Sequence, residues 1–563
     1  MSQRLSVFFY ILIVLFLVAF LAYPLMKIIK GGFVNESGHL TLDYVFEVFR
    51  NPIYLEGLWN SFTLAVAALL LVSVIALPMA VLNAGYVYPG KSIFSSLILV
   101  PMILPPFVGA IGFRQFWGQA GVFNSLLLAL GLPDWMAVDW LGVSRFWGVA
   151  LAMALHLYPI LYLNTVAALA NLDPAMEEAA RNLGAGKWLR FRKVTYPLML
   201  PGLFAGGTIV FIWAFTELGT PLMFDYTRVT SVQVFEALKE IGDNPLSYVL
   251  VVLLLASSVI LYGAGRATLK SGERAMVSRG GRGSTEKQLT GWRCGLALVF
   301  LLLVTGAAML PHIGVVLVSF SQDWYATVLP ERWTLGHYRD ALEHSFTVPS
   351  IANSLRYAGI ASLVDLVIGV AAAWIVVRTR LPGRAILDSL LMAPLAVPGI
   401  VLAFGYLAMT QPGEWFQFLD PSVDPALLLV IAYSIRRLPY VVRSVIAGLE
   451  QSSESLEEAG RNLGAAPMRV LRRITLPLVS ANLVAGAILA FCFAMLEVSD
   501  SLMLAQKQMD YPITKAIFEL FQLLGEGRSL AAALGVWCMA FLGVGLLLAG
   551  NLLGKRLGAL FRV

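Results

Sequence analysis

The chain has 563 residues, of which 58% are hydrophobic and only 13% are charged, and its formal net charge is +6. Soluble domains carry about 25% charged residues, so a value near half of that argues against a soluble protein and points to the bilayer. Cys294, Cys492 and Cys538 lie in or beside apolar segments and lack C-x-x-C spacing. We expect packing cysteines, with neither a disulfide framework nor a stable metal site.

Twelve apolar segments are long enough to cross a ~30 Å hydrocarbon core, which needs roughly 20 residues per helix. Lipid offers the backbone no hydrogen-bond partners, so each segment should be helical. The expected fold class is an all-α polytopic membrane protein with about twelve transmembrane helices in two parallel six-helix repeats. The predicted spans are 7–28, 59–83, 93–113, 147–169, 199–220, 246–265, 294–319, 354–377, 386–409, 426–447, 478–499 and 530–553.

An internal repeat relates the two halves. Glu177–Gly186 reads E-E-A-A-R-N-L-G-A-G and Glu457–Ala466 reads E-E-A-G-R-N-L-G-A-A, so eight of ten positions are identical at a separation of 280 residues. Earlier in each half, matching residues are 293 apart, including the prolines expected to break spans three and nine. Those prolines are Pro101, Pro105 and Pro106, and Pro394 and Pro398. The predicted division is 1–267 for the first half, 268–292 for a basic linker and 293–563 for the second half.

Lys and Arg are concentrated on one side of the predicted membrane. The connector 266–293 carries seven basic residues against two acidic ones, and basic residues also follow both decapeptides. The positive-inside rule makes this side cytoplasmic and places both termini there. Because this placement accounts for the positive charge, no nucleic-acid partner is expected.

Each decapeptide is predicted to form a cytoplasmic helix–turn–helix. Asp173 and Ser453 have the residue types of N-caps, and Gly184 and Gly464 those of left-handed helix stops. Small residues along the first helix would allow another protein to approach closely. Gene duplication alone would also leave two similar loops, but the flanking spans have diverged heavily while the loops have not, which favours a docking surface.

The loops resemble the signature loop of permease subunits of binding-protein-dependent ABC importers, which reads E-A-A, three residues, G, and then a longer gap to hydrophobic-x-L-P. Departures are mild: Gly460 replaces the second alanine and Tyr196 the usual leucine. The resemblance covers both halves, is strongest to the ferric-iron permease group, and implies a type I importer permease fold. The residues it assigns to ATPase coupling are Glu177, Glu178, Ala179, Ala180, Arg181, Gly184 and Pro197, and Glu457, Glu458, Ala459, Gly460, Arg461, Gly464 and Pro477.

The resemblance also implies partners and a location. The loops would dock on two copies of a cytoplasmic ABC ATPase subunit, which would bind ATP and Mg, while this chain would bind no cofactor and catalyse no reaction. A periplasmic or lipid-anchored binding protein would deliver the solute. The expected location is the bacterial cytoplasmic (inner) membrane, where the chain contacts membrane lipid.

One motif argues for ATP binding by the chain itself. Gly85–Ser92 fits G-x-x-x-x-G-K-[ST], the phosphate-binding loop, which works between a strand and a helix. Here it joins spans two and three, and Pro89 removes a backbone donor. We interpret it as a cytoplasmic turn.

Several polar residues are candidates for the pathway or an outer gate. Glu217 and Glu497 match at the 280 offset and should lie near the outer interface with Asp500, as an acidic ring suited to a hard cation such as ferric iron. Alternatively, they are helix-end carboxylates at headgroup water, or an ion pair that locks the gate. Asn60 and Asn353 are interpreted as helix caps, with a pathway role left open.

Two further charged positions lie inside predicted spans. Asp365 falls in span eight and Arg436-Arg437 in span ten. A buried pair between them is the favoured interpretation, although a pathway charge is also open. Asp365 is the one feature that favours an ion-gradient-driven secondary transporter, and no convergent groups support a membrane enzyme.

The importer permease is therefore the predicted function, with ferric iron as the first choice of solute. Alternatives for the same machine are 2-aminoethylphosphonate, thiamine, a polyamine or a phosphorylated small molecule.

Overall fold

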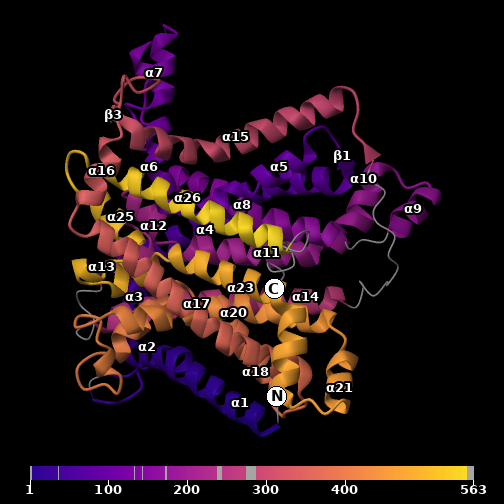
Figure 1. Ribbon diagram of the computed structural model, residues 1–563. Helices are drawn as coiled ribbons and strands as arrows, with labels where there is room; N and C mark the ends of the chain where they lie inside the picture. Colours follow the sequence, from indigo (N-terminus) through magenta and orange to yellow (C-terminus); the bar gives the residue numbers. More distant parts are fainter. Residues whose placement is uncertain are drawn as a thin grey trace. The chain divides into compact units, whose positions relative to one another are not determined.

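The computed structural model describes residues 3–35, 37–131, 133–142, 144–170, 174–237, 244–273 and 287–553, and this part is mainly helical (Figure 1). Its strands are short. Within the described ranges, β1 (Tyr86–Val87) pairs in parallel with β2 (Lys287–Gln288), and β3 (Ser321–Asp323) pairs antiparallel with β4 (Arg332–Trp333). Asp173, the predicted first cap, and residues 274–286 of the predicted linker lie outside the described residues.

Nine helices of the described part are long and apolar enough to cross a membrane, or eleven if each of two bent pairs is one span. The bent pairs are Lys91–Ile103 with Pro106–Ala129, at 104°, and Arg384–Leu395 with Gly399–Met409, at 101°. They lie where prolines were predicted to break spans three and nine. The remaining predicted span is the helix α20 (Ala426–Gln451), which carries three arginines and is not among these helices.

The described chain forms two compact units, each built from both sequence repeats. Within the described residues, unit 1 comprises those of 3–55, 230–256 and 338–553, and unit 2 comprises those of 56–229 and 257–337. Thus the first helices of the chain belong to the unit that holds most of the second repeat. This packing division differs from the division into halves predicted from the repeat, which concerns sequence similarity and stays a prediction.

Unit 1 contains the following helices, with η marking 3₁₀ and π turns: α1 (Gln3–Leu17), η1 (Val18–Ala22), α2 (Tyr23–Phe33), α3 (Asp43–Arg50), α13 (Thr230–Glu236), most of α16 (Gly336–Glu343), α17 (Thr347–Arg378), α18 (Arg384–Met392), η6 (Ala393–Leu395), α19 (Gly399–Met409), η7 (Gln417–Leu419), α20, α21 (Glu454–Asn462), α22 (Pro467–Val470), η8 (Leu471–Thr475), α23 (Leu476–Met495), α24 (Ser499–Leu504), η9 (Gln508–Asp510), α25 (Ile513–Gln522) and α26 (Gly527–Leu553).

Unit 2 contains most of α4 (Pro52–Gly85), α5 (Lys91–Leu97), η2 (Val100–Ile103), α6 (Pro106–Trp117), α7 (Val122–Ala129), η3 (Asp134–Met136), α8 (Arg145–Ala170), α9 (Pro174–Asn182), α10 (Lys187–Arg190), η4 (Phe191–Thr195), α11 (Tyr196–Thr216), α12 (Gly219–Met223) and α15 (Trp292–Phe320). The helix α14 (Pro245–Glu273) contributes to both units.

In unit 2, α15 packs against α6 through backbone contact. A Cβ added to Gly112 would overlap the carbonyl oxygen of Pro311 and lie 2.7 Å from the backbone nitrogen of Val315. Gly314 lies at the same contact, where an added Cβ would be 2.6 Å from the Gly112 Cα. Only glycine permits this approach, because a side chain would force two backbones apart.

Unit 1 repeats this arrangement with α2 against α19. Gly405 occupies the position that corresponds to Gly112, 293 residues later, and an added Cβ would lie 2.9 Å from the Pro24 Cβ. The Tyr406 hydroxyl also donates to the Phe20 carbonyl at 2.9 Å. Each unit therefore uses a glycine to seat a helix from the other repeat.

We expect Gly112→Ala to lower the apparent stability of the purified protein by about 1–3 kcal/mol, the usual cost of overpacking. Gly306→Ala on α15 is the matched control, since an added Cβ there meets nothing within 4 Å. Thermal unfolding in detergent measures both variants. Equal unfolding midpoints would contradict the importance of the Gly112 contact.

Candidate coupling loops and buried charges

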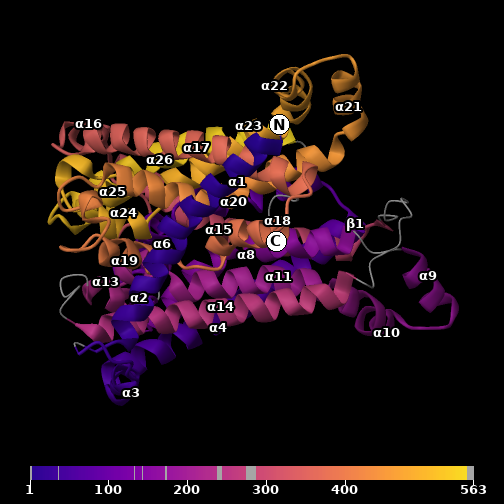
Figure 2. The same ribbon diagram turned by 90° about the horizontal axis from the view of Figure 1, so that it is seen from below.

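The two repeated loops adopt the same backbone structure. In unit 2, α9 is followed by α10 and the π turn η4, which leads into α11; in unit 1, α21 is followed by α22 and η8, which leads into α23. Figure 2 shows α9 and α10 beyond the ends of α8 and α11, and α21 and α22 beyond the ends of α20 and α23. The Ser453 side chain accepts from the backbone of Ser455, so the predicted second cap is confirmed.

The first helix of each loop stops in the same way. Gly184 has φ of +80° and Gly464 has φ of +85°, which confirms both predicted left-handed stops. After the glycine, the Ala185 amide donates to the Ala180 carbonyl at 3.0 Å, and the Ala465 amide donates to the Gly460 carbonyl at 3.1 Å. These bonds satisfy carbonyls that the end of a helix leaves open.

Each loop presents an exposed leucine just before its glycine. Leu183 is 88% exposed and Leu463 is 89% exposed, each directly after the first helix of its loop. Single exposed leucines are common, but here the same residue is equally exposed at the tip of both copies. The leucine is identical in both decapeptides, and this identity is the signal in the sequence by which it could have been selected.

The loops differ in how their acidic residues are used. Glu457 is buried and pairs with Arg378 at 3.2 Å, while Glu177, at the corresponding position, is exposed. The Arg378 guanidinium also donates to the carbonyls of Leu449 at 2.8 Å and Ser452 at 3.0 Å. Glu457 therefore anchors α21 to the ends of α17 and α20, whereas Glu178 and Glu458 are exposed.

The burial of α21 also explains the departure at Gly460. A Cβ added there would lie 2.6 Å from the Ile474 Cδ1. Ala180, at the corresponding position of the first copy, is half-buried. Gly460 thus lets α21 lie closer to the turn η8 than an alanine would.

A cluster of four charged side chains lies in unit 1 between α20 and α24. Arg436 bonds Glu497 at 2.5 Å and approaches Asp500 at 3.5 Å, while Arg437 bonds the other oxygen of Glu497. The Glu497 and Asp500 side chains are 4% and 0% exposed. Of the interpretations left open for these carboxylates, the ion pair fits this geometry.

Neighbouring hydroxyl groups fix the backbone at this cluster. The Ser501 hydroxyl donates to the Glu497 carbonyl at 2.6 Å, and the Thr514 hydroxyl donates to the same oxygen at 2.7 Å. Tyr433, from α20, bonds Ser501 at 2.7 Å. Because α20, α24 and α25 all contribute, the carboxylates are held in a rigid, desolvated setting.

The favoured pairing of Asp365 with the arginines was wrong. Both arginines form their ion pairs with the carboxylates described above, and among the described residues neither pairs with Asp365. The buried Asp365 instead accepts from the Ser434 hydroxyl at 2.5 Å. Sequence distance could not reveal that Glu497 comes nearer, because α20 meets the end of α23 only in the folded chain.

Asn60 and Asn353 are not helix caps, contrary to the favoured interpretation. The helices α4 and α17 begin several residues earlier, so both asparagines lie inside them. The Asn60 amide donates to the Arg228 carbonyl at 2.8 Å, and the Asn353 amide to the Met509 carbonyl at 2.7 Å. Each amide thus ties its own span to the loop that follows the fifth span of its repeat.

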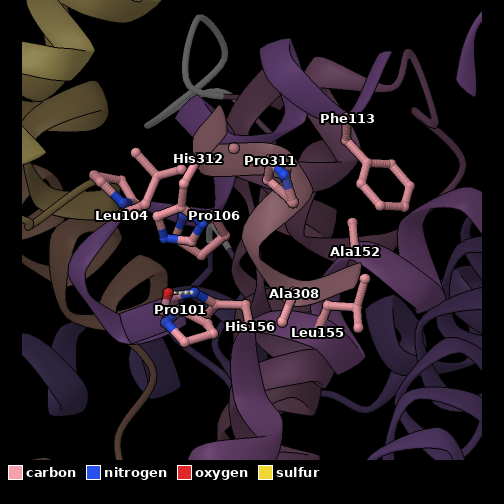
Figure 3. A pocket seen from close by; sticks show the side chains of 12 residues that line it. Pro101, Leu104, Pro106, Phe113, Ala152, Leu155, His156, Ala308, Pro311 and His312 are labelled. Atoms are coloured by element: carbon pink, nitrogen blue, oxygen red, sulfur yellow. Dashed lines mark hydrogen bonds between the residues drawn. The ribbon is translucent and has the colours of Figure 1, made fainter. Parts of the chain in front are cut away.

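The first repeat has a different arrangement where the second has its ion cluster. Glu217 accepts from the Thr220 amide at 3.1 Å and from its hydroxyl at 3.2 Å. At the 280 offset, His156 replaces Arg436, and its Nδ1 lies 2.9 Å from the Pro101 carbonyl (Figure 3). The adjoining pocket, of about 20 Å³, is otherwise mainly apolar and also includes His312 from α15.

The phosphate-loop pattern runs from the last residue of α4 through the two-residue β1 to the start of the seven-residue α5. The Lys91 ammonium, which would contact a phosphate in such a loop, donates to the Tyr86 carbonyl at 2.9 Å. The lysine is therefore used to close its own turn, in agreement with the interpretation as a connecting turn.

Comparison with known proteins bears on both repeats. Residues 73–269 and 365–559 match the family described as binding-protein-dependent transport system inner membrane component. The chain belongs to this family. It is accordingly a multi-pass permease of an ABC transporter and not the ATPase.

Individual relatives are more distant. The putative ferric transport system permease protein FbpB 1 of Haemophilus influenzae is 26% identical over 516 residues, covering 86% of this permease and 76% of the relative. The ferric transport system permease protein FbpB of Actinobacillus pleuropneumoniae is 25% identical over 514 residues, covering 86% and 70%. The molybdenum transport system permease protein ModB of Escherichia coli is 32% identical over 208 residues, covering 35% and 89%.

Breaking the anchor of α21 should destabilise the permease. Glu457→Gln leaves the buried Arg378 without its anion, which typically costs about 3–5 kcal/mol. Glu177→Gln alters the exposed counterpart in α9 and should change stability by less than about 0.5 kcal/mol. Thermal unfolding of the two variants in detergent tests the difference, and similar midpoints would contradict the anchoring role.

The contribution of the arginine cluster to stability can be tested in the same way. Glu497→Gln leaves two arginines without their shared carboxylate and should also cost about 3–5 kcal/mol. The control Glu343→Gln removes an exposed pair with Arg339 and should cost under about 1 kcal/mol. A Glu497→Gln protein that unfolds at the wild-type midpoint would show that the cluster does not hold α20 and α24 together.

Proposed function

We propose that this permease forms the membrane pathway of an ATP-driven importer and that α9 and α21 are its coupling helices. The observation that carries the proposal is the loop built twice, with the same helix stop and the same exposed leucine. Two equivalent loops fit a partner that has two equivalent clefts. Two copies of a cytoplasmic ABC ATPase subunit provide them, and the ATPase binds ATP and Mg.

The proposed orientation follows from the charges beside each loop. Basic residues occupy α10 with η4 and α22 with η8, and the positive-inside rule places such residues in the cytoplasm. Both termini then lie on the cytoplasmic side. A periplasmic or lipid-anchored binding protein delivers the solute to the opposite side.

Ferric iron is the proposed solute. Its support comes from the two relatives named as ferric transport permeases, which align with 86% of the permease. The carboxylates Glu497 and Asp500 add little support for a cationic solute, because arginines neutralise them in this structure. In this proposal the binding protein selects the metal, and these charges contribute to gating.

The coupling assignment is tested with Glu178→Lys combined with Glu458→Lys. Two exposed charges are reversed at the proposed interface, so ATPase binding should weaken about tenfold or more, which corresponds to at least ~1.4 kcal/mol. Copurification of the ATPase subunit and uptake of radioactive iron into cells are the measurements.

The control combines Glu47→Lys with Glu331→Lys, which reverses two exposed charges outside the loops. It should retain the ATPase at the wild-type stoichiometry. If the loop variant still copurifies with its ATPase at the wild-type stoichiometry, the coupling assignment fails. If ATPase binding is lost as expected but wild-type protein takes up no iron, the solute assignment alone fails.

A further inference from the structure

A groove in unit 1 runs along α17 and α23. It encloses about 540 Å³ and is widely open on one side. The residues that line it are Leu355, Arg356, Gly359, Ile360, Ser362, Leu363, Leu366, Ala487, Ile488 and Phe491.

The lining fits a hydrocarbon chain. Eight of its ten residues are leucine, isoleucine, alanine, phenylalanine or glycine, and only Arg356 and Ser362 are polar. Both helices belong to the candidate membrane spans. Ser362 donates its hydroxyl back to the Ala358 carbonyl at 2.7 Å, so it offers the groove little polarity. Gly359 leaves a hollow, since an added Cβ would meet nothing within 4 Å.

Arg356 is the one charged residue of this lining. It is exposed and forms no ion pair with any residue that the structure describes. An arginine in a membrane span is costly unless it reaches an anion or water. Since no described residue supplies an anion, the guanidinium can pair with one from outside the described part of the permease.

The position of Arg356 along α17 places it at the height of lipid phosphates. Arg378 ends the same helix, 22 residues later. At ~1.5 Å per residue the two arginines are about 33 Å apart, close to the ~30 Å thickness of the hydrocarbon core. If Arg378 marks one boundary of the core, Arg356 lies at the other.

The first repeat lacks this combination. Thr63 of α4 corresponds to Arg356 at the 293 offset, and its hydroxyl donates to the Trp59 carbonyl at 2.8 Å. A charge at this height is thus not a general requirement of the repeat. Its presence beside a groove in one repeat only points to a binding site.

We propose that the α17–α23 groove binds a phospholipid, with an acyl chain in the groove and the headgroup phosphate paired with Arg356. The site favours an anionic lipid such as phosphatidylglycerol over phosphatidylcholine, whose own ammonium competes for the phosphate charge. A free phosphate ion would use only the arginine and leave the apolar lining exposed to water. The occupant is therefore a lipid.

Native mass spectrometry of the purified permease, with phosphatidylglycerol or phosphatidylcholine added in detergent, tests the site. The wild type should retain phosphatidylglycerol about fivefold better, as expected for one basic residue near a lipid surface. Arg356→Gln should bring this preference close to one. Gly359→Leu, which fills the hollow, should reduce retention of both lipids.

Two control variants keep these outcomes specific. Arg339→Gln removes an exposed arginine away from the groove, and Gly306→Leu adds a side chain where an added Cβ meets nothing within 4 Å; both should behave as wild type. Wild-type lipid retention by Gly359→Leu would overturn the proposal. So would displacement of phosphatidylglycerol from the wild type by millimolar inorganic phosphate, which would show that the arginine binds phosphate alone.

Discussion

In each compact unit, close contact at one glycine lets a helix of the other repeat pack against the unit's own helices. In a membrane, apolar surface gains little from contact with other apolar surface, so helices associate through close packing. Gly112 and Gly405 provide that packing at corresponding positions, each against a proline-containing helix from the other repeat. Since α15 and α2 are the helices seated in this way, neither repeat completes its unit from its own sequence.

On this common framework the repeats handle charge differently. The second repeat places two arginines in α20 and neutralises them with Glu497 and Asp500, which ties α20 to α24. The first repeat has His156 and Leu157 at the arginine positions and a mainly apolar pocket beside them. Burying charged pairs costs desolvation energy, but the directional contacts of the pairs fix the positions of the side chains. The second repeat therefore fixes α20 against α24 by arginine contacts that the first repeat does not have at the corresponding positions.

Local sequence was sufficient for features that depend on local chemistry. Apolar length predicted the spans that the described residues show, apart from α20, which is not among the helices apolar enough to cross a membrane. Prolines predicted the two breaks, and Gly184, Gly464 and Ser453 predicted their turns and cap. It failed where the partner is distant in sequence. Asn60 and Asn353 have cap chemistry, yet their amides bind loops more than 150 residues away, because α4 and α17 start earlier than their apolar stretches.

Contacts with residues distant in sequence also make the two coupling loops differ. Identical E-E-A sequences gave no indication that Glu457 is buried against Arg378 while Glu177 is exposed. If the loops couple as proposed, force on α21 reaches α17 and α20 through a buried charged pair and its hydrogen bonds. In the first copy, the described contacts of α9 pass through its own turn and η4 into α11. In that case the matching leucine tips would meet the ATPase equally, while the second loop would transmit the motion to more of the membrane framework.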